Sequence, residues 1–245
     1  HYILSHKKPI IHDRHLIPGS TTTREIGVPM YPELIGTLLW PELKSIGQRE
    51  LNPNDISPED ADILNLEVFP FWMDRNVREY CRKRFNNPVS QQLEERFVLY
   101  FMMKNNAISH TVPDFKLVIE KGLEKIKIKA KEKENRGGDP AVMAFYKSIQ
   151  LCVDGILEYT RHLREEALQQ ITTLDKNMPE QARRVEELTH IAEICQRVPL
   201  KPARTVYEGL VAIWICLVCL HAENADSALS IGRLDQLLQP LFARD

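Results

Sequence analysis

Eleven consecutive apolar residues, from Leu210 to Leu220, constrain the fold of this chain more than any other feature. A membrane span needs about 18 such residues, so this shorter run predicts a helix buried on all sides in a protein core. The run ends at a polar cluster that contains Asn224, Asp226 and Ser227, after which a new helical pattern begins. A buried helix that delivers polar side chains into one short turn is typical of the wall of an enzyme pocket.

A second polar island lies between two apolar stretches and ends in Ser109, His110 and Thr111. Buried polar groups need hydrogen-bond partners, so these residues either line a cavity or cap the neighbouring helix ends. Both roles fit the residues equally well.

The composition argues against several classes of function. The 245 residues carry a formal net charge of −2, which gives no reason to expect a nucleic-acid or polybasic membrane contact. No apolar run is as long as a membrane span, and the first residues do not resemble a signal peptide. The five cysteines are an odd number scattered through helical patterns, as in a reducing compartment. We therefore expect a cytoplasmic chain that binds neither nucleic acid nor membrane.

Two patterns that resemble metal sites have a simpler explanation. Cys216 and Cys219 have the spacing of a metal or redox pair, but they lie inside the apolar run and no second pair completes a site. The histidines at positions 1, 6, 12 and 15 lack the spacing of a ligand motif. We expect the two cysteines to be core residues and the chain to hold no metal.

Composition and helical periodicity divide the chain into three segments. Residues 1–56 are rich in proline and glycine, which favours extended segments and turns. Residues 57–204 have long helical periodicity. Residues 205–245 contain the core helix, the pocket turn and the start of a further element. The predicted fold of the chain is mainly α.

Three helix starts carry capping signals. Ser57 and Asp139 each precede a proline at a first helical position. Thr205, with Glu208 three residues later, forms a capping-box pattern that opens the apolar run.

The stretch from Lys121 to Arg136 is rich in lysine, but Glu120, Glu124, Glu132 and Glu134 are interleaved with these lysines. It has no aromatic residues of the kind that stack on nucleic-acid bases. We predict a solvated helix face with ion pairs between residues four apart.

Four segments occur in an order that is shared with a known enzyme family. They are Leu16-Ile17-Pro18-Gly19 with Arg24, Pro29 and Pro32-Glu33; Val68-Phe69-Pro70-Phe71-Trp72 with Asn76-Val77 and Cys81; His110 with Phe115 through Leu123; and Pro199, Pro202 and Thr205 with Ser230-Ile231-Gly232-Arg233-Leu234-Asp235-Gln236. Together they resemble the glycyl radical enzymes, the pyruvate formate-lyase-like family. No single segment is decisive, and the resemblance rests on the order of all four.

The resemblance implies that the chain is the N-terminal portion of a larger α/β protein with a ten-stranded barrel. In that family an iron–sulfur, S-adenosylmethionine-dependent activase converts a glycine to a radical. A cysteine thiyl radical then abstracts a hydrogen atom from a small-molecule substrate. A homodimeric parent is implied as well. No cysteine here lies in a Gly-Cys-x-Glu context, and no Arg-Val-x-Gly-Tyr occurs. We therefore expect this chain by itself to bind no cofactor and to be inactive, with no catalytic residue of its own.

One departure from the family pattern bears on the substrate. Aligned on His110, the family's Gly-Asp-x-His element has Ile108 in place of the Asp. An apolar side chain neither accepts a proton nor holds an ammonium group, which argues against choline, glycerol and hydroxyproline as substrates. The serine-containing turn is more similar to that of the arylacetate decarboxylases, in which a serine meets a carboxylate. A pocket with Ile108, Met102, Met103 and Trp40 would suit such an apolar substrate.

The predicted substrate-binding residues are Ser227, His110, Ile108 and Asn224. A turn hydroxyl such as that of Ser227 can hydrogen-bond a substrate oxygen but cannot perform radical chemistry. Arg233 and Asp235 are predicted to be an internal ion pair or an anchor at a helix start, because a buried charge is normally paired.

The predicted function of the parent is that of a radical lyase that cleaves a C–C or C–heteroatom bond in a small organic acid, as a decarboxylase or in the manner of a formate acetyltransferase. Two alternatives remain open. One is an aryl- or alkylsuccinate synthase that adds a hydrocarbon to fumarate. The other is a non-catalytic helical interaction protein derived from the family.

Overall fold

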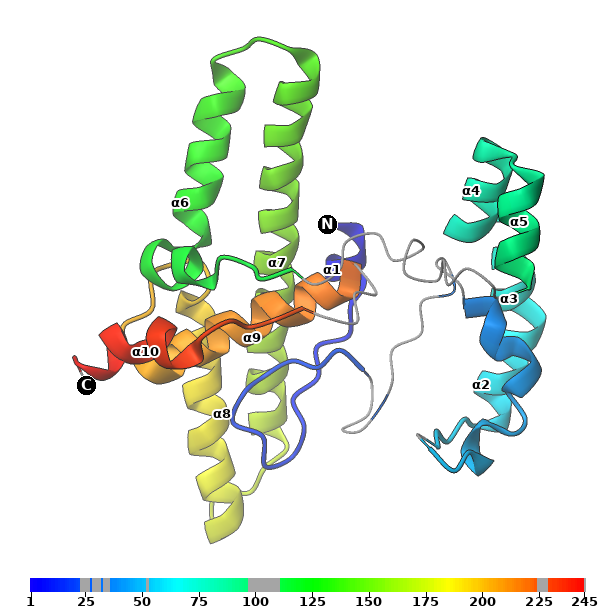
Figure 1. Cartoon of the computed structure of the whole chain (residues 1–245). Coiled ribbons are helices and arrows are strands. Elements are labelled where there is room, and N and C mark those ends of the chain that lie inside the picture. The colour runs from blue at the N-terminus through cyan, green and yellow to red at the C-terminus, as the bar shows by residue number, and fades with distance from the viewer. Residues whose placement is uncertain are drawn as a thin grey trace. The chain divides into compact units, whose positions relative to one another are not determined.

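The computed structural model describes residues 1–22, 27, 32, 36–51, 53–96, 111–223 and 229–244 (Figure 1). The helices are α1 (Tyr2–His6), η1 (Gly36–Glu42), η2 (Ile46–Gln48), α2 (Pro58–Ile63), η3 (Leu64–Val68), α3 (Phe69–Trp72), α4 (Val77–Phe85), α5 (Pro88–Glu95), α6 (Phe115–Asn135), α7 (Pro140–Thr172), α8 (Pro179–Arg197), α9 (Val206–Glu223) and α10 (Leu234–Phe242). These ranges contain no strand, and the predicted mainly α character is confirmed for them.

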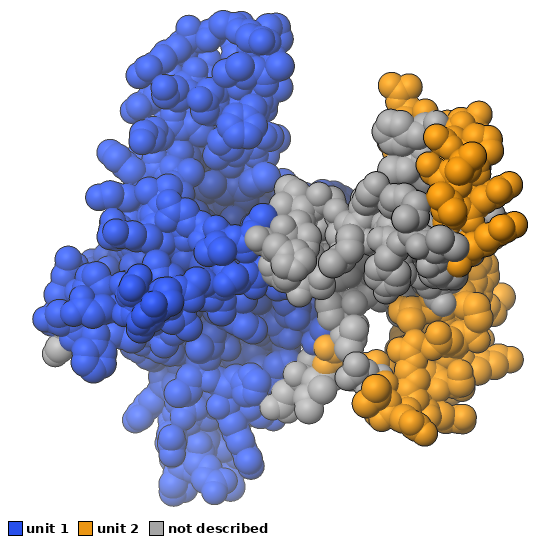
Figure 2. Space-filling model, in the orientation of Figure 1, with its two compact units in different colours: residues 1–25, 110–223, 228–245 blue, residues 26–109, 224–227 orange. Residues whose placement is uncertain are grey.

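The chain folds as two compact units (Figure 2). Unit 1 comprises residues 1–25, 110–223 and 228–245, and unit 2 comprises residues 26–109 and 224–227. The three-segment division at 56/57 and 204/205 stays a prediction.

The core of unit 1 forms around α9, the helix of the apolar run. Val211, Ile215 and Val218 are fully buried on it, and α9 contacts α6, α7 and α10 (Figure 1). Cys216 and Cys219 belong to the same core, as predicted. Burial of the thiol raises the pKa of Cys216 to about 12, so this side chain is a neutral packing group at physiological pH.

The predicted helix starts are confirmed. The side chain of Ser57 accepts a hydrogen bond from the Asp60 N–H at 3.1 Å, and that of Asp139 accepts one from Ala141 at 2.8 Å. Each satisfies an amide that has no partner within the first turn of its helix.

The start of α9 departs from the predicted capping box in one respect. Thr205 Oγ1 accepts from the Glu208 N–H at 3.1 Å, as expected. The Glu208 carboxylate, however, accepts from the N–H of Arg204 at 2.6 Å and from the Arg197 guanidinium at 3.4 Å. It therefore links α9 to the end of α8 as well as capping its own helix.

The N-terminal segment is less extended than predicted, because residues 2–6 form α1 and two 3₁₀ helices follow in unit 2. Its loop is anchored on α9 by side chains that donate to its carbonyl groups. The Trp214 ring N–H donates to the Gly19 oxygen at 2.9 Å, and the Tyr207 hydroxyl donates to the Leu16 oxygen. These bonds compensate for the lack of regular structure in the loop.

Helix α6 is interrupted at Gly122, which has a φ of +74°. The amides of Leu123 and Glu124 donate to the carbonyls of Pro199 and Leu200, at 2.9 and 3.1 Å. On the other side of the break, the Ile119 carbonyl accepts from the Ala203 N–H at 2.9 Å. The chain after α8 thus takes over hydrogen bonds that a continuous helix would have made.

The ion pairs of the lysine-rich part of α6 differ from the prediction. Lys127 pairs with Asp154 on α7, and Glu124 pairs with Lys201 at 2.5 Å. The Glu134 carboxylate accepts from the Gln150 side chain of α7 at 2.6 Å. Packing of α6 against other elements supplies partners for these residues, so the prediction of pairs four residues apart is wrong for them. It is confirmed for Glu120, which pairs with Lys116 four residues earlier at 3.9 Å.

In unit 2, Trp40 is part of the packing between η1 and the helices after it. Its ring lies 5.5 Å from that of Phe69, and its N–H donates to the Asn65 side chain at 2.6 Å. Asn76 is buried and caps α4 by accepting from the Glu79 N–H.

Candidate functional site

The four predicted substrate-binding residues, Ser227, His110, Ile108 and Asn224, lie outside the described residues. The structure does describe the chain immediately C-terminal to each polar island, from Thr111 onward in the first case and from Leu229 onward in the second.

The described ends of the two islands meet in unit 1. The N–H of Ser230 donates to the carbonyl of Thr111 at 3.0 Å. These residues are 119 positions apart in the sequence. The hydrogen bond therefore joins the residue that follows His110 to the described segment that follows the second polar island.

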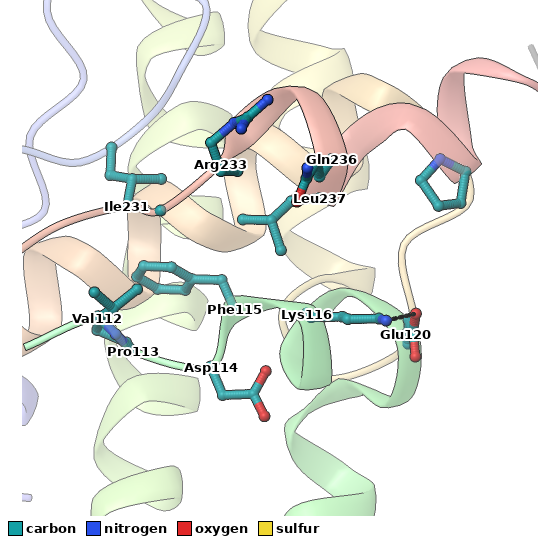
Figure 3. A pocket seen from close by; sticks show the side chains of 12 residues that line it. Val112, Pro113, Asp114, Phe115, Lys116, Glu120, Ile231, Arg233, Gln236 and Leu237 are labelled. Atoms are coloured by element: carbon teal, nitrogen blue, oxygen red, sulfur yellow. Dashed lines mark ion pairs between the residues drawn. The ribbon is translucent and has the colours of Figure 1, made fainter.

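A hollow of about 490 Å³ lies beside this junction (Figure 3). Its wall comes from the beginning of α6 on one side and from the beginning of α10 on the other. The lining residues are Val112, Pro113, Asp114, Phe115, Lys116, Glu120, Ile231, Gly232, Arg233, Gln236, Leu237 and Pro240. A volume of this order is typical of small-molecule sites.

The α6 side of the hollow is organised by Asp114 and Phe115. The Asp114 carboxylate accepts from the Leu117 N–H at 3.0 Å and so caps α6. The next side chain, Phe115, is only 2% exposed and belongs to the core of unit 1. The buried Phe115 ring holds the start of α6 in the core of unit 1, and the Asp114 cap satisfies an amide of the first turn.

The α10 side begins with a tight turn at Gly232, which has a φ of +80°. Its N–H donates to Ser230 Oγ at 3.2 Å, and a Cβ at this position would lie 3.4 Å from Val112. Glycine adopts this backbone conformation without the strain that a side chain would add. The turn therefore brings residues 230–233 close to residue 112 across the hollow.

Helix α10 is held on α9 by a close approach at Gly209. A Cβ on Gly209 would lie 2.8 Å from methyl groups of both Leu238 and Leu241. The absence of a side chain at this position lets the two helices pack closely, which fixes the α10 wall of the hollow relative to the core.

Arg233 and Asp235 pair with each other at the start of α10. The Arg233 Nε donates to Asp235 Oδ1 at 2.9 Å, and the side chains are 70% and 63% exposed. The shared hydrogen bonds raise the pKa of Arg233 and lower the pKa of Asp235, so both stay charged at neutral pH. The pair lies at the surface of the described residues, and its role as an anchor stays a prediction.

The lining of the hollow combines charged and apolar side chains. Lys116 and Glu120 face each other at 3.9 Å along α6 (Figure 3). Phe115, Ile231 and Leu237 add apolar groups to the lining. Such a surface suits a small molecule with a charged and an apolar part.

Sequence reasoning missed Asp114 and Gln236 as wall residues. The signal for Asp114 was present, since Pro113-Asp114 precedes the helical pattern as a cap. No local pattern marks Gln236 as a neighbour of α6, because that contact depends on how α10 packs.

Trp40, which we associated with the substrate pocket, packs within unit 2 as described above. In the described ranges there is no group of three or more His, Cys, Asp or Glu placed to hold a metal ion. Among the described helices, none combines the length and the apolar character of a membrane-spanning segment.

Comparison with known proteins assigns the family. The model of the family described as pyruvate formate lyase-like matches residues 1–245. The chain is 28% identical to isethionate sulfite-lyase of Nitratidesulfovibrio vulgaris over 96% of the chain and 30% of that protein. It is 27% identical to trans-4-hydroxy-L-proline dehydratase of Clostridioides difficile over 100% of the chain and 31% of that protein.

A solved structure agrees with these relatives. The glycyl radical enzyme from Archaeoglobus fulgidus superposes with a TM-score of 0.83 at 25% identity, over 99% of this chain and 31% of that one. The chain thus spans about a third of the length of the proteins that it matches. It belongs to the pyruvate formate-lyase-like family of glycyl radical enzymes.

Proposed function

We propose that this chain forms part of the substrate chamber of a radical lyase that cleaves a small organic acid. The observation that carries the proposal is the hydrogen bond from the Ser230 amide to the Thr111 carbonyl, beside the hollow. It joins Thr111, the residue after His110, to Ser230, which follows Asn224 and Ser227 by six and three positions. These sequence neighbours carry an imidazole, an amide and a hydroxyl. Such groups can bind and orient a carboxylate or sulfonate.

The names of the relatives favour a lyase over an acyltransferase. The relatives reported above are a sulfite-lyase and a dehydratase, and isethionate and hydroxyproline are both small organic acids. We therefore favour cleavage of a C–heteroatom or C–C bond over formate acetyltransferase-like chemistry. Decarboxylation of an arylacetate remains our narrower hypothesis, because Ile108 replaces the family's polar residue before His110.

Membership of the family implies a glycyl radical that an S-adenosylmethionine-dependent activase installs. That radical would supply the means of removing a hydrogen atom from the substrate. This chain's contribution is to bind the acid and to exclude water. We expect Ser227 to donate a hydrogen bond to a substrate oxygen. In unit 1, the apolar side chains of Phe115 and Ile231 line the hollow and would exclude water from it. The ten-stranded barrel, the homodimer and the activase as a partner complete the proposal.

The test uses the full polypeptide, activated without oxygen and offered isethionate, trans-4-hydroxy-L-proline and indole-3-acetate in turn. We expect turnover of one of these acids. A full radical signal without turnover of any of them would contradict the assignment to this substrate class.

A variant then tests the binding role. Ser227→Ala should raise KM about tenfold, the equivalent of one lost hydrogen bond of about 1.4 kcal/mol, with the radical yield unchanged. Ser45→Ala is the control, because the Ser45 hydroxyl is exposed and bonds only the Glu42 carbonyl of its own turn. An unchanged KM in Ser227→Ala would remove this residue from the site.

A further inference from the structure

A second hollow, of about 500 Å³, lies along α6 and faces α7. Its apolar lining is formed by Leu117, Ile126, Ile128, Ala130, Tyr146 and Ile149. Leu117 and Ile128 are 41% and 45% exposed, although they are large apolar residues. An exposed apolar surface that is concave is typical of a binding groove.

A row of four lysines borders this groove. Lys121, Lys125, Lys129 and Lys133 follow one another at four-residue spacing on α6, and all four line the hollow and are exposed. None of them has an ion-pair partner in the part of the chain that the structure describes. Other lysines of the same helix are paired, since Lys116 contacts Glu120 and Lys127 contacts Asp154.

We propose that this groove docks an acidic amphipathic helix of a partner protein. Lys125, Lys129 and Lys133 lie beyond the break at Gly122 and span eight residues, or roughly 12 Å along a helix, which corresponds to about two turns of a bound helix. The apolar face of such a helix would cover Leu117, Ile126 and Ile128. Acidic residues at its margin would pair with the four lysines, which otherwise have no described counter-charge.

Charge and shape together favour this occupant over other anionic surfaces. Nucleic acid binds basic side chains through its phosphates and has no apolar face to cover Leu117, Ile126 and Ile128. A membrane surface takes up a protruding apolar face, whereas these apolar residues line a hollow. A helix with both an apolar and an acidic face matches both features of the groove.

The experiment measures binding of a synthetic peptide to the purified protein by fluorescence anisotropy. The probe is an 18-residue helical peptide with leucines at i, i+3, i+4 and i+7 spacing and glutamates beside them. The comparison peptide has lysines in place of the glutamates. We expect the acidic peptide to bind, the basic peptide not to bind, and the affinity of the acidic peptide to fall with added salt.

Matched variants locate the site. Lys125→Glu/Lys129→Glu should weaken binding of the acidic peptide at least tenfold. Lys131→Glu/Lys176→Glu makes the same change in net charge away from the groove lining and should leave binding unchanged. An equal loss in both variants, or no binding of the acidic peptide, would overturn the proposal. Binding to anionic vesicles or self-association through this face, in place of peptide binding, would overturn it too.

Discussion

Helices α9 and α6 have similar lengths, 18 and 21 residues, but they are stabilised in opposite ways. The α9 helix is apolar on nearly all sides and forms the core of unit 1. The α6 helix carries seven basic and four acidic residues. It is attached to the unit by a few buried residues and by hydrogen bonds at the break beside Gly122.

The difference shows that side-chain burial and backbone hydrogen bonding stabilise the same unit separately. The buried side chains of α9 pack in the core, so a smaller side chain there should lower the free energy of unfolding. The position of α6 depends on its buried residues, on its pairs with α7 and on one interruption at which residues 199–203 meet the helix. The first hollow borders the start of α6, and the second lies along the helix on both sides of the break, so this interruption bears on both proposals.

Gly122→Ala should have the largest effect. A Cβ at this position would lie 2.4 Å from the Leu200 oxygen, and the φ of +74° is unfavourable for alanine. We expect a loss of about 4 kcal/mol in the free energy of unfolding, from backbone strain and overlap together. Urea denaturation followed by circular dichroism measures it.

Gly137→Ala is the control, because its φ of +71° is nearly the same and nothing lies within 4 Å of its Cβ. It should lose only about 1–2 kcal/mol. Equal losses in the two variants would show that the contact with residues 199–203 is unimportant.

Ile215→Ala should be the next most costly change. Ile215 is fully buried on α9, and its truncation leaves a cavity in the core. The expected loss is about 3 kcal/mol in urea denaturation. Ile128→Ala on α6 removes the same atoms from a residue that is 45% exposed and should change stability by less than about 0.5 kcal/mol. Similar losses at the two sites would contradict the contrast between the helices.

Alkaline pH should destabilise the core through its buried thiols. In the unfolded chain the Cys216 thiol ionises near its ordinary value, whereas the folded pKa is raised to about 12 by burial. Stability is therefore complete below the unfolded pKa and falls between about pH 9 and 12, because only the unfolded chain releases the proton.

Between pH 7.5 and pH 10, Cys216 should account for about 1.5 kcal/mol of the loss. Replacing it by alanine should reduce the pH dependence by that amount, measured as the difference between denaturation curves at the two pH values. Cys152→Ala is the comparison, since that thiol is exposed. A pH dependence unchanged in Cys216→Ala would place this thiol in contact with water.

Thr205→Ala should have the smallest effect of the four. It removes the hydroxyl that caps the Glu208 amide at the start of α9, at an expected cost of about 1 kcal/mol. Thr189→Ala, within α8, loses only a bond to the Val185 carbonyl of its own helix and should be nearly neutral. If thermal unfolding shows no difference between the two, packing alone fixes the start of α9.

The features that the sequence predicted correctly are local ones. The apolar run specified the buried helix, and Ser57, Asp139 and Thr205 marked helix starts, because the physics of each operates within a few residues. The family followed from four short segments. Residues that bear on substrate, above all Ser227 and His110, stay predictions.

The features that the sequence did not predict depend on distant contacts. The break at Gly122 requires the carbonyls of residues 199 and 200, and the junction beside the first hollow requires Thr111 and Ser230. The partner of Lys127 is Asp154 on another helix. Periodicity and capping rules do not include such contacts, because they describe one element at a time.

The most direct test of the account is electron paramagnetic resonance of the full polypeptide after anaerobic treatment with its radical S-adenosylmethionine activase, S-adenosylmethionine and reductant. We predict a glycyl radical signal that disappears on exposure to oxygen, followed by turnover of a small organic acid. An activase that produces the signal in another glycyl radical enzyme but none in this polypeptide would contradict the assignment of a radical lyase.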